Sequence, residues 1–318
     1  MRRPWLLLIV ALLIAAFTLL AQKKPATLAP PQKDSSTPVF AVETREVPLN
    51  ITVTDRSGHL VTNLPQSAFH VYENNVLQTI KVFRRDDAPV SMALVIDNSG
   101  SMREKRQAVE AAALALVKDS NPQDESFVIN FNEDAYLDVD FTNDLEKLKS
   151  GLARIDSRGE TAMREALRLS IDHLHEKAKR EKKVIIVVTD GNDNASEPSF
   201  SMEKLIQLAQ KNDVVIYAIG LLTDEERSEA AKAKRALNEL VQSTGGEVFY
   251  PKDLSEVEPI AHQVARDIRN QYFISYTPVN TALDGTYRPI KVVVKAQGNP
   301  TPRTRLGYWA NSSPAARN

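Results

Sequence analysis

The residues best suited to chemistry lie in the segment Asp97-Asn98-Ser99-Gly100-Ser101. It offers one carboxylate and two hydroxyls at alternate positions, and alternate side chains of a curling loop can point at one centre. Oxygen donors suit hard divalent cations such as Mg2+, Mn2+ and Ca2+. The segment therefore predicts part of a metal site.

The flanking sequence says how this segment is held. The apolar run Met92–Ile96 precedes it and predicts a buried strand, and an Ala-rich pattern predicts a helix over 103–118. A loop between a strand and a helix is where open α/β sheets bind ligands. The helix N-terminus would add positive potential there, which is worth about 0.3–1 kcal/mol for a nearby anion.

Two further loops supply oxygen ligands. Asp190 follows the apolar run 184–188, and Thr161 opens a second helical pattern. Carboxyl ends of parallel strands share one edge of a sheet, so the two aspartates are expected to meet there. The predicted metal-binding residues are Asp97, Ser99, Ser101, Thr161 and Asp190. Two carboxylates at best neutralise a divalent ion, which favours an acidic side chain from a partner protein as the remaining ligand.

The order and spacing of these five residues resemble the metal-ion-dependent adhesion site of von Willebrand factor type A domains, over roughly 90–270. The resemblance implies a doubly wound sheet that binds Mg2+ or Mn2+ at its C-terminal edge. It also implies direct metal contacts for Ser99, Ser101 and Thr161, and contacts mostly through water for Asp97 and Asp190. Glu160 departs from the family, which more often has Gly there. The flanking strands also resemble a group of exported bacterial proteins that carry this domain.

Other kinds of site were weighed. The hydroxyls could simply cap helices, Ser99 or Ser101 one over 103–118 and Thr161 one over 162–180. An EF-hand requires Gly and Glu where Met102 and Ala108 stand. His173 and His175 lie on different helix faces and make a poor zinc pair. No nucleophile elbow, P-loop or dinucleotide fingerprint is present, so the sequence indicates a non-enzymatic protein.

The region 89–270 alternates strand and helix patterns and is predicted to be an α/β domain: a doubly wound, mostly parallel sheet with helices on both faces. One antiparallel edge strand is expected at 135–141. Short alternating strands at 40–88 cannot close a core alone. We expect them to pair with strands in 271–310 in a small β-sandwich into which the α/β domain is inserted. Residues 311–318 form a tail.

The ends and the composition bear on localisation. Arg2 and Arg3 precede the apolar run 5–21, which fits either a cleaved signal peptide or an uncleaved membrane anchor. A Pro-rich linker follows over 22–39. The chain has no cysteine, which excludes disulfides and thiolate metal sites. Forty basic and 41 acidic residues give no basic excess for nucleic acid. We expect a bacterial exported protein that is periplasmic, secreted or anchored through 5–21.

The first hypothesis is an exported adhesion or assembly module that binds an Asp or Glu of a partner protein through an ion of the Mg2+ type. Two alternatives stay open. One is a structural component of a cell-envelope assembly that uses strand edges independently of metal. The other is a metal-dependent hydrolase, with Asp97 and Asp190 as its carboxylate pair.

Overall fold

The structure is a computed structural model, and it describes residues 46–85, 87–153, 157–191 and 193–310. The predicted targeting segment 1–21, the linker 22–39 and the tail 311–318 lie outside this part of the chain. Within the described residues, no helix has both the length and the apolar character needed to cross a membrane.

The α/β domain is built on a six-stranded sheet in the order β10-β9-β8-β5-β6-β7. All neighbouring strands run parallel except β6 and β7, so the predicted antiparallel edge strand is confirmed. The four inner strands are apolar runs covered on both faces, as expected for a parallel sheet. The strands are β5 (Val90–Asp97), β6 (Glu125–Phe131), β7 (Ala135–Thr142), β8 (Lys182–Thr189), β9 (Val214–Gly220) and β10 (Val248–Phe249).

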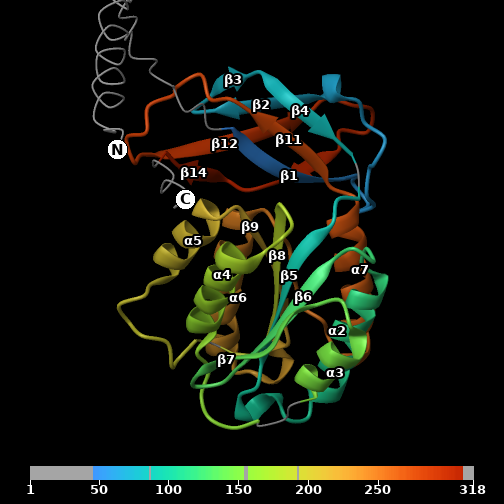
Figure 1. Cartoon of the computed structure of the whole chain (residues 1–318), viewed down its shortest axis with the longest axis vertical. Helices are drawn as coiled ribbons and strands as arrows, with labels where there is room; N and C mark the ends of the chain where they lie inside the picture. The colour runs from blue at the N-terminus through green and yellow to red at the C-terminus, as the bar shows by residue number, and fades with distance from the viewer. Residues whose placement is uncertain (1–45, 86, 154–156, 192, 311–318) are drawn as a thin grey trace, which may run out of the picture. The chain divides into compact units, whose positions relative to one another are not determined.

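Helices cover both faces of this sheet (Figure 1). One face packs against α2 (Arg106–Asp119), α3 (Leu145–Leu152) and α7 (Val257–Arg269). The other packs against α4 (Met163–Lys177), α5 (Met202–Lys211) and α6 (Arg227–Thr244). Short 3-10 turns lie at η1 (Gln66–Ala68), η2 (Gly100–Met102), η3 (Leu222–Asp224) and η4 (Leu254–Glu256). The predicted doubly wound architecture is therefore confirmed.

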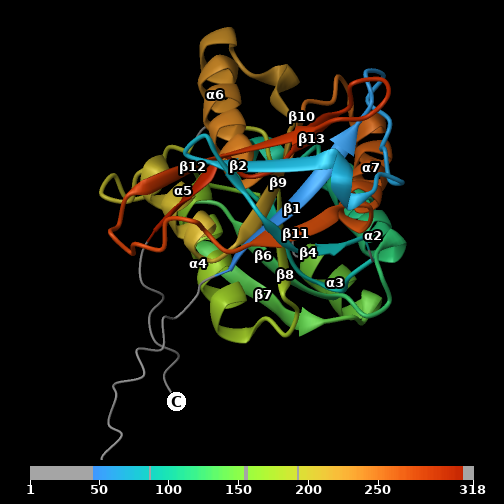
Figure 2. The same ribbon diagram turned by 90° about the horizontal axis from the view of Figure 1, so that it is seen from above.

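Two antiparallel sheets make up the predicted sandwich, in the orders β13-β1-β11-β4 and β14-β12-β2-β3. Strands from before and after the α/β domain pair directly: β1 with β11 and β2 with β12 (Figure 2). Their inward side chains share one apolar core. The strands are β1 (Val47–Thr54), β2 (Phe69–Glu73), β3 (Val76–Gln78), β4 (Ile80–Arg84), β11 (Tyr272–Tyr276), β12 (Tyr287–Val294), β13 (Thr301–Arg303) and β14 (Gly307–Trp309).

Two details of the sandwich differ from the sequence prediction. The short strand β3 was missed, and it forms a hairpin with β2 through Asn74 and Asn75, which both have positive φ. The sequence predicts a last strand over 304–309, of which only Gly307–Trp309 is observed as β14, whereas β13 (Thr301–Arg303) was not predicted. The reason is topological, because the chain leaves one sheet after Arg303 and joins the other at Gly307.

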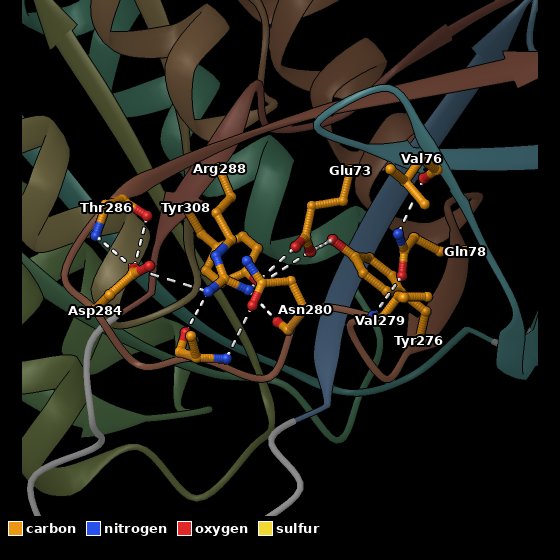
Figure 3. A network of polar contacts seen from close by, with 11 residues as sticks. Glu73, Val76, Gln78, Tyr276, Val279, Asn280, Asp284, Thr286, Arg288 and Tyr308 are labelled. Carbon is orange, nitrogen blue, oxygen red and sulfur yellow. Dashed lines mark hydrogen bonds and ion pairs between the residues drawn. The ribbon is translucent and has the colours of Figure 1, made fainter.

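A buried polar cluster links strands of the two sheets inside the sandwich (Figure 3). Glu73 is 2% exposed, and its Oε2 accepts hydrogen bonds of 2.9 Å from the hydroxyls of both Tyr276 and Tyr308. Its Oε1 lies 3.3 Å from Nη1 of Arg288. The Arg288 guanidinium also donates to two backbone carbonyls, through Nη1 to Asn280 and through Nη2 to Ala282. Burial, followed by the charge of Glu73, raises the pKa of Tyr276. The cluster ties strands from both ends of the chain to the loop before β12.

Candidate metal site at the carboxyl edge of the sheet

Asp97 ends β5 and is fully buried. Its Oδ1 accepts a 2.8 Å hydrogen bond from the Ser99 backbone N–H. Its Oδ2 accepts a 2.6 Å bond from the hydroxyl of Thr189, the last residue of the neighbouring strand β8. Both carboxylate oxygens are therefore engaged in shaping the loop. Such a group orients the loop around an ion more readily than it contacts the ion itself.

The second aspartate meets the serine pair. Ser101 Oγ donates a 2.9 Å hydrogen bond to Oδ1 of Asp190, and the hydroxyls of Ser99 and Ser101 lie 3.3 Å apart. Neighbouring oxygens of an octahedron around Mg2+ are about 3 Å apart, given Mg–O distances of about 2.0–2.1 Å. The donor set and these spacings fit a small hard cation. Ser101 is exposed, so the site opens to solvent.

The loop that carries Thr161 packs against the Asp97 loop. The backbone N–H of Gly100 lies 3.4 Å from the carbonyl of Gly159, and the N–H of Arg158 bonds the carbonyl of Asn98 at 3.2 Å. Thr161 itself is 6% exposed. The three predicted segments therefore meet. Hydrogen bonds link Asp97, Ser99, Ser101 and Asp190 across the ends of β5 and β8. The loop of Thr161 packs beside them.

A third loop fixes Thr161. Its backbone N–H donates a 2.8 Å hydrogen bond to Oδ1 of Asn194, and its carbonyl accepts from the N–H groups of Asn194 and Ala195. Asp193 in the same loop accepts from the first turn of α4. This loop supports Thr161 although none of its residues is among the five predicted metal-binding residues.

The helix-capping alternative does not hold. The residue that precedes α4 is Ala162, and the residue that precedes α2 is Lys105. Ser99 precedes η2, yet its side chain makes no capping hydrogen bond. The predicted helix start at 103 is also wrong, because η2 takes up the first turn and α2 begins at Arg106. The helix dipole therefore acts from further away than expected, and its effect falls off within a turn.

Lys105 is a charged residue of the site that the sequence did not predict. Its Nζ lies 2.7 Å from Oδ2 of Asp190, and the two side chains are 8% and 0% exposed. Its place in the charged stretch 103–106 gives no sequence signal of this contact. Two aspartates and one lysine leave this buried cluster with a formal charge of −1, so it still favours a cation.

Burial raises the pKa of Asp97 to about 6, against the opposing hydrogen bonds from Ser99 and Thr189. A cation beside this carboxylate would favour its charged form. Among the described residues, no cluster of three or more His, Cys, Asp or Glu side chains could hold a metal. A metal site built here thus depends on the hydroxyls.

The histidines have other roles. His173 lies 2.8 Å from Oδ1 of Asp140, and its ring stacks on Phe141 at 5.3 Å. This arrangement anchors α4 to β7 and does not resemble a zinc site.

Residues 92–192 match the family model of the von Willebrand factor type A domain. This range contains all five predicted metal-binding positions. A search of curated proteins finds no match.

Solved structures with a similar fold include three bacterial proteins. A von Willebrand factor type A protein from Catenulispora acidiphila is 14% identical, with a TM-score of 0.49 over 76% of this chain and 75% of that one. The conserved hypothetical protein BatB from Bacteroides thetaiotaomicron is 18% identical, with a TM-score of 0.45 over 56% and 98%. The von Willebrand factor domain of the type V pili tip protein Mfa5 from Porphyromonas gingivalis is 14% identical, with a TM-score of 0.44 over 57% and 96%. Likeness at this level says nothing about what this chain binds.

Proposed function

Because the chain contains a von Willebrand factor type A domain, we propose that it is an exported, non-enzymatic module that binds a partner protein through a divalent cation. Asp97, Ser99, Ser101, Thr161 and Asp190 hold the ion, which is Mg2+, with Mn2+ or Ca2+ as substitutes. An Asp or Glu of the partner completes the coordination. Export rests on the basic and apolar pattern of residues 2–21.

One observation supports this proposal above the others: hydroxyls from two positions of one loop meet a carboxylate 89 residues away in sequence, at the carboxyl edge of a parallel sheet. Asp97 holds the loop backbone, and Asp190 orients Ser101. The bound cation supplies a positive charge to which a carboxylate of the partner can bind.

The charges favour an acidic partner. The buried cluster carries −1, so a divalent ion leaves it at +1. A carboxylate ligand from outside neutralises that excess. The exposed position of Ser101 marks the side from which the partner approaches.

A pull-down from envelope extracts tests the proposal. Partner capture is expected in Mg2+, lost in EDTA and restored when Mg2+ is returned. Asp97→Ala and Ser99→Ala should abolish capture while circular dichroism shows an intact fold. Ser120→Ala is a matched control, because its hydroxyl only bonds the Leu116 carbonyl at the end of α2. Capture that is unchanged in EDTA contradicts the proposal.

A second candidate is a structural part of an envelope assembly that uses strand edges. It is favoured by β3, an edge strand whose Val76 and Leu77 are 50% and 55% exposed. Exposed apolar edge strands readily pair with other chains. This function predicts self-association that EDTA leaves unchanged and Leu77→Lys abolishes. The remaining alternative, a metal-dependent hydrolase, would show turnover in a phosphatase and esterase screen that Asp97→Asn removes.

A further inference from the structure

A second site lies at the opposite edge of the same sheet. A cavity of about 820 Å³ opens where β1, β4 and β11 of the sandwich meet the residues that begin β8 and β9. We call it the interdomain cavity. Strand β8 separates it from Asp190 by roughly 25 Å, at about 3.3 Å per residue. Its volume falls within the roughly 300–1,000 Å³ of small-molecule sites, which often lie between domains.

The walls of this cavity are rich in basic side chains. Six line it against three acidic ones: Arg84, Lys179, Arg180, Lys182, Lys183 and Arg305 against Glu46, Glu181 and Asp213. Part of this charge is already matched, because Arg305 pairs with Asp213 at 2.6 Å and Arg84 with Glu181 at 3.5 Å.

Lys182 donates to the backbone carbonyl of Ile268, which leaves three cations available to a guest. Within the described residues, Lys179, Arg180 and Lys183 form no ion pair. Their backbone is nonetheless fixed, since Lys179 N–H donates to Glu125 at 2.7 Å and Arg180 N–H to Ser91 at 3.1 Å. The cations are therefore presented by a segment that is held in place.

Buried polar atoms of the cavity also lack a protein partner among the described residues. Gln210 and Gln271 are 3% and 4% exposed, and the side-chain oxygen of each has no hydrogen-bond donor. Three further buried atoms of the cavity also lack a hydrogen-bond partner among the described residues: Nε of Arg180, Nε of Arg305 and the hydroxyl of Thr304. Buried polar groups in native proteins are nearly always paired. Two carbonyl acceptors in the same cavity as cationic donors suit a guest that carries both an anionic group and hydroxyls.

We infer that the interdomain cavity binds a small oxyanion that carries hydroxyl groups, the chemistry of an acidic or phosphorylated sugar. Its carboxylate or phosphate lies against Arg180 and Lys183. Its hydroxyls donate to the side-chain carbonyls of Gln210 and Gln271. The site does not depend on the proposed metal, because it lies at the opposite edge of the sheet.

Calorimetric titration of the full chain tests this inference. EDTA is present throughout, so that binding at the metal site cannot contribute. The probes are glucuronate for the carboxylate, glucose 6-phosphate for the phosphate, inorganic phosphate for the bare anion, and glucose as the neutral control. We expect glucuronate or glucose 6-phosphate to bind, glucose not to bind, and inorganic phosphate to bind at least about tenfold more weakly than the better sugar.

Variants locate the binding. Arg180→Gln with Lys183→Gln should weaken the better sugar at least about tenfold, because each removes a charged contact. Lys177→Gln is the control: it removes one positive charge two residues before the cavity, and its sugar binding should match that of the unchanged protein. Ser99→Ala should also bind normally, which separates this site from the proposed metal site.

The inference is overturned if neither acidic sugar binds, if inorganic phosphate binds as tightly as the sugars, or if the double variant binds as well as the Lys177→Gln control.

Discussion

The hydroxyl of Ser101 lies 2.9 Å from the carboxylate of Asp190, although 89 residues separate them in the chain. The contact exists because β5 and β8 are parallel neighbours whose carboxyl ends reach the same edge. It joins the first and last of the three segments that form the candidate metal site. The first prediction follows from it.

Ser101→Ala should remove the stabilisation of the protein by Mg2+. An ion that binds only the folded state at 100 times its dissociation constant adds about 2.7 kcal/mol to the free energy of unfolding. Thermal unfolding in EDTA and in excess Mg2+ measures this gain for each protein. The gain should vanish in Ser101→Ala and persist in Ser120→Ala. A gain of equal size in both variants would contradict the assignment of Ser101.

Protons should compete with the ion at Asp97. The folded pKa of about 6 lies above the usual value of 3.8, so the folded state binds the proton more tightly than the unfolded state. In EDTA, the stability that the Asp97 carboxyl contributes is therefore greatest below pH 3.8. This contribution is lost as the pH rises through 6. The shift of about two units corresponds to about 3 kcal/mol.

Urea midpoints between pH 4 and 8 check the contribution of Asp97. Asp97→Asn removes the titrating group while keeping an acceptor for the Ser99 N–H, so the difference between the two proteins isolates the carboxyl. The variant should gain stability relative to the unchanged protein as pH rises through 6 in EDTA. Parallel pH profiles of the two proteins would show that the Asp97 carboxyl titrates normally.

Lys105→Met should destabilise the metal-free protein. It leaves the buried carboxylate of Asp190 without the ammonium group 2.7 Å away, and such a loss costs about 3–5 kcal/mol. Added Mg2+ should restore part of this loss, so its stabilising effect should exceed that in the unchanged protein. Chemical denaturation with and without Mg2+ measures both quantities.

The matched control for this change is Lys177→Met, which breaks an exposed pair with Asp140 and should cost less than about 1 kcal/mol. An equal, small cost for both lysine variants would mean that Lys105 does not balance the charge of Asp190.

The sandwich should depend on the pair of Arg288 and Glu73. Arg288→Met leaves a buried carboxylate uncompensated and should cost about 3–5 kcal/mol of unfolding free energy. Adding Glu73→Gln removes that charge and keeps an acceptor for the hydroxyls of Tyr276 and Tyr308. The double variant should therefore be more stable than Arg288→Met alone in urea denaturation. If the second change lowers stability further, the charge of Glu73 is not the cause of the loss.

Much of the fold could be predicted from the sequence because its hydrophobic patterns are local and strong. The apolar run before Asp97 and the run before Asp190 each predicted a buried strand, and parallel topology then brought both aspartates to one edge. Pairing between the ends of the chain was predicted because three or four strands alone cannot close a core. Strand β13 escaped prediction, since its pairing with β1 depends on the partner strand rather than on residues 301–303.

The candidate site was predicted in its outline but not in its supports. Thr189 ends an apolar run, and nothing in the sequence marks it as the donor to Asp97. Asn194 lies in an ordinary polar loop, and only the fold brings it to Thr161. Lys105 stands in a charged stretch typical of a solvated helix, and its burial results from the turn η2 that delays the start of α2. Each of these contacts depends on tertiary structure.

The most direct test of the account is a crystal structure grown in Mn2+, with the ion located by its anomalous scattering. We expect one strong peak within about 2.5 Å of the hydroxyls of Ser99, Ser101 and Thr161, a distance typical of oxygen ligands. A structure with no peak there, or with the Thr161 hydroxyl turned away from an ion bound by the serines, would contradict it.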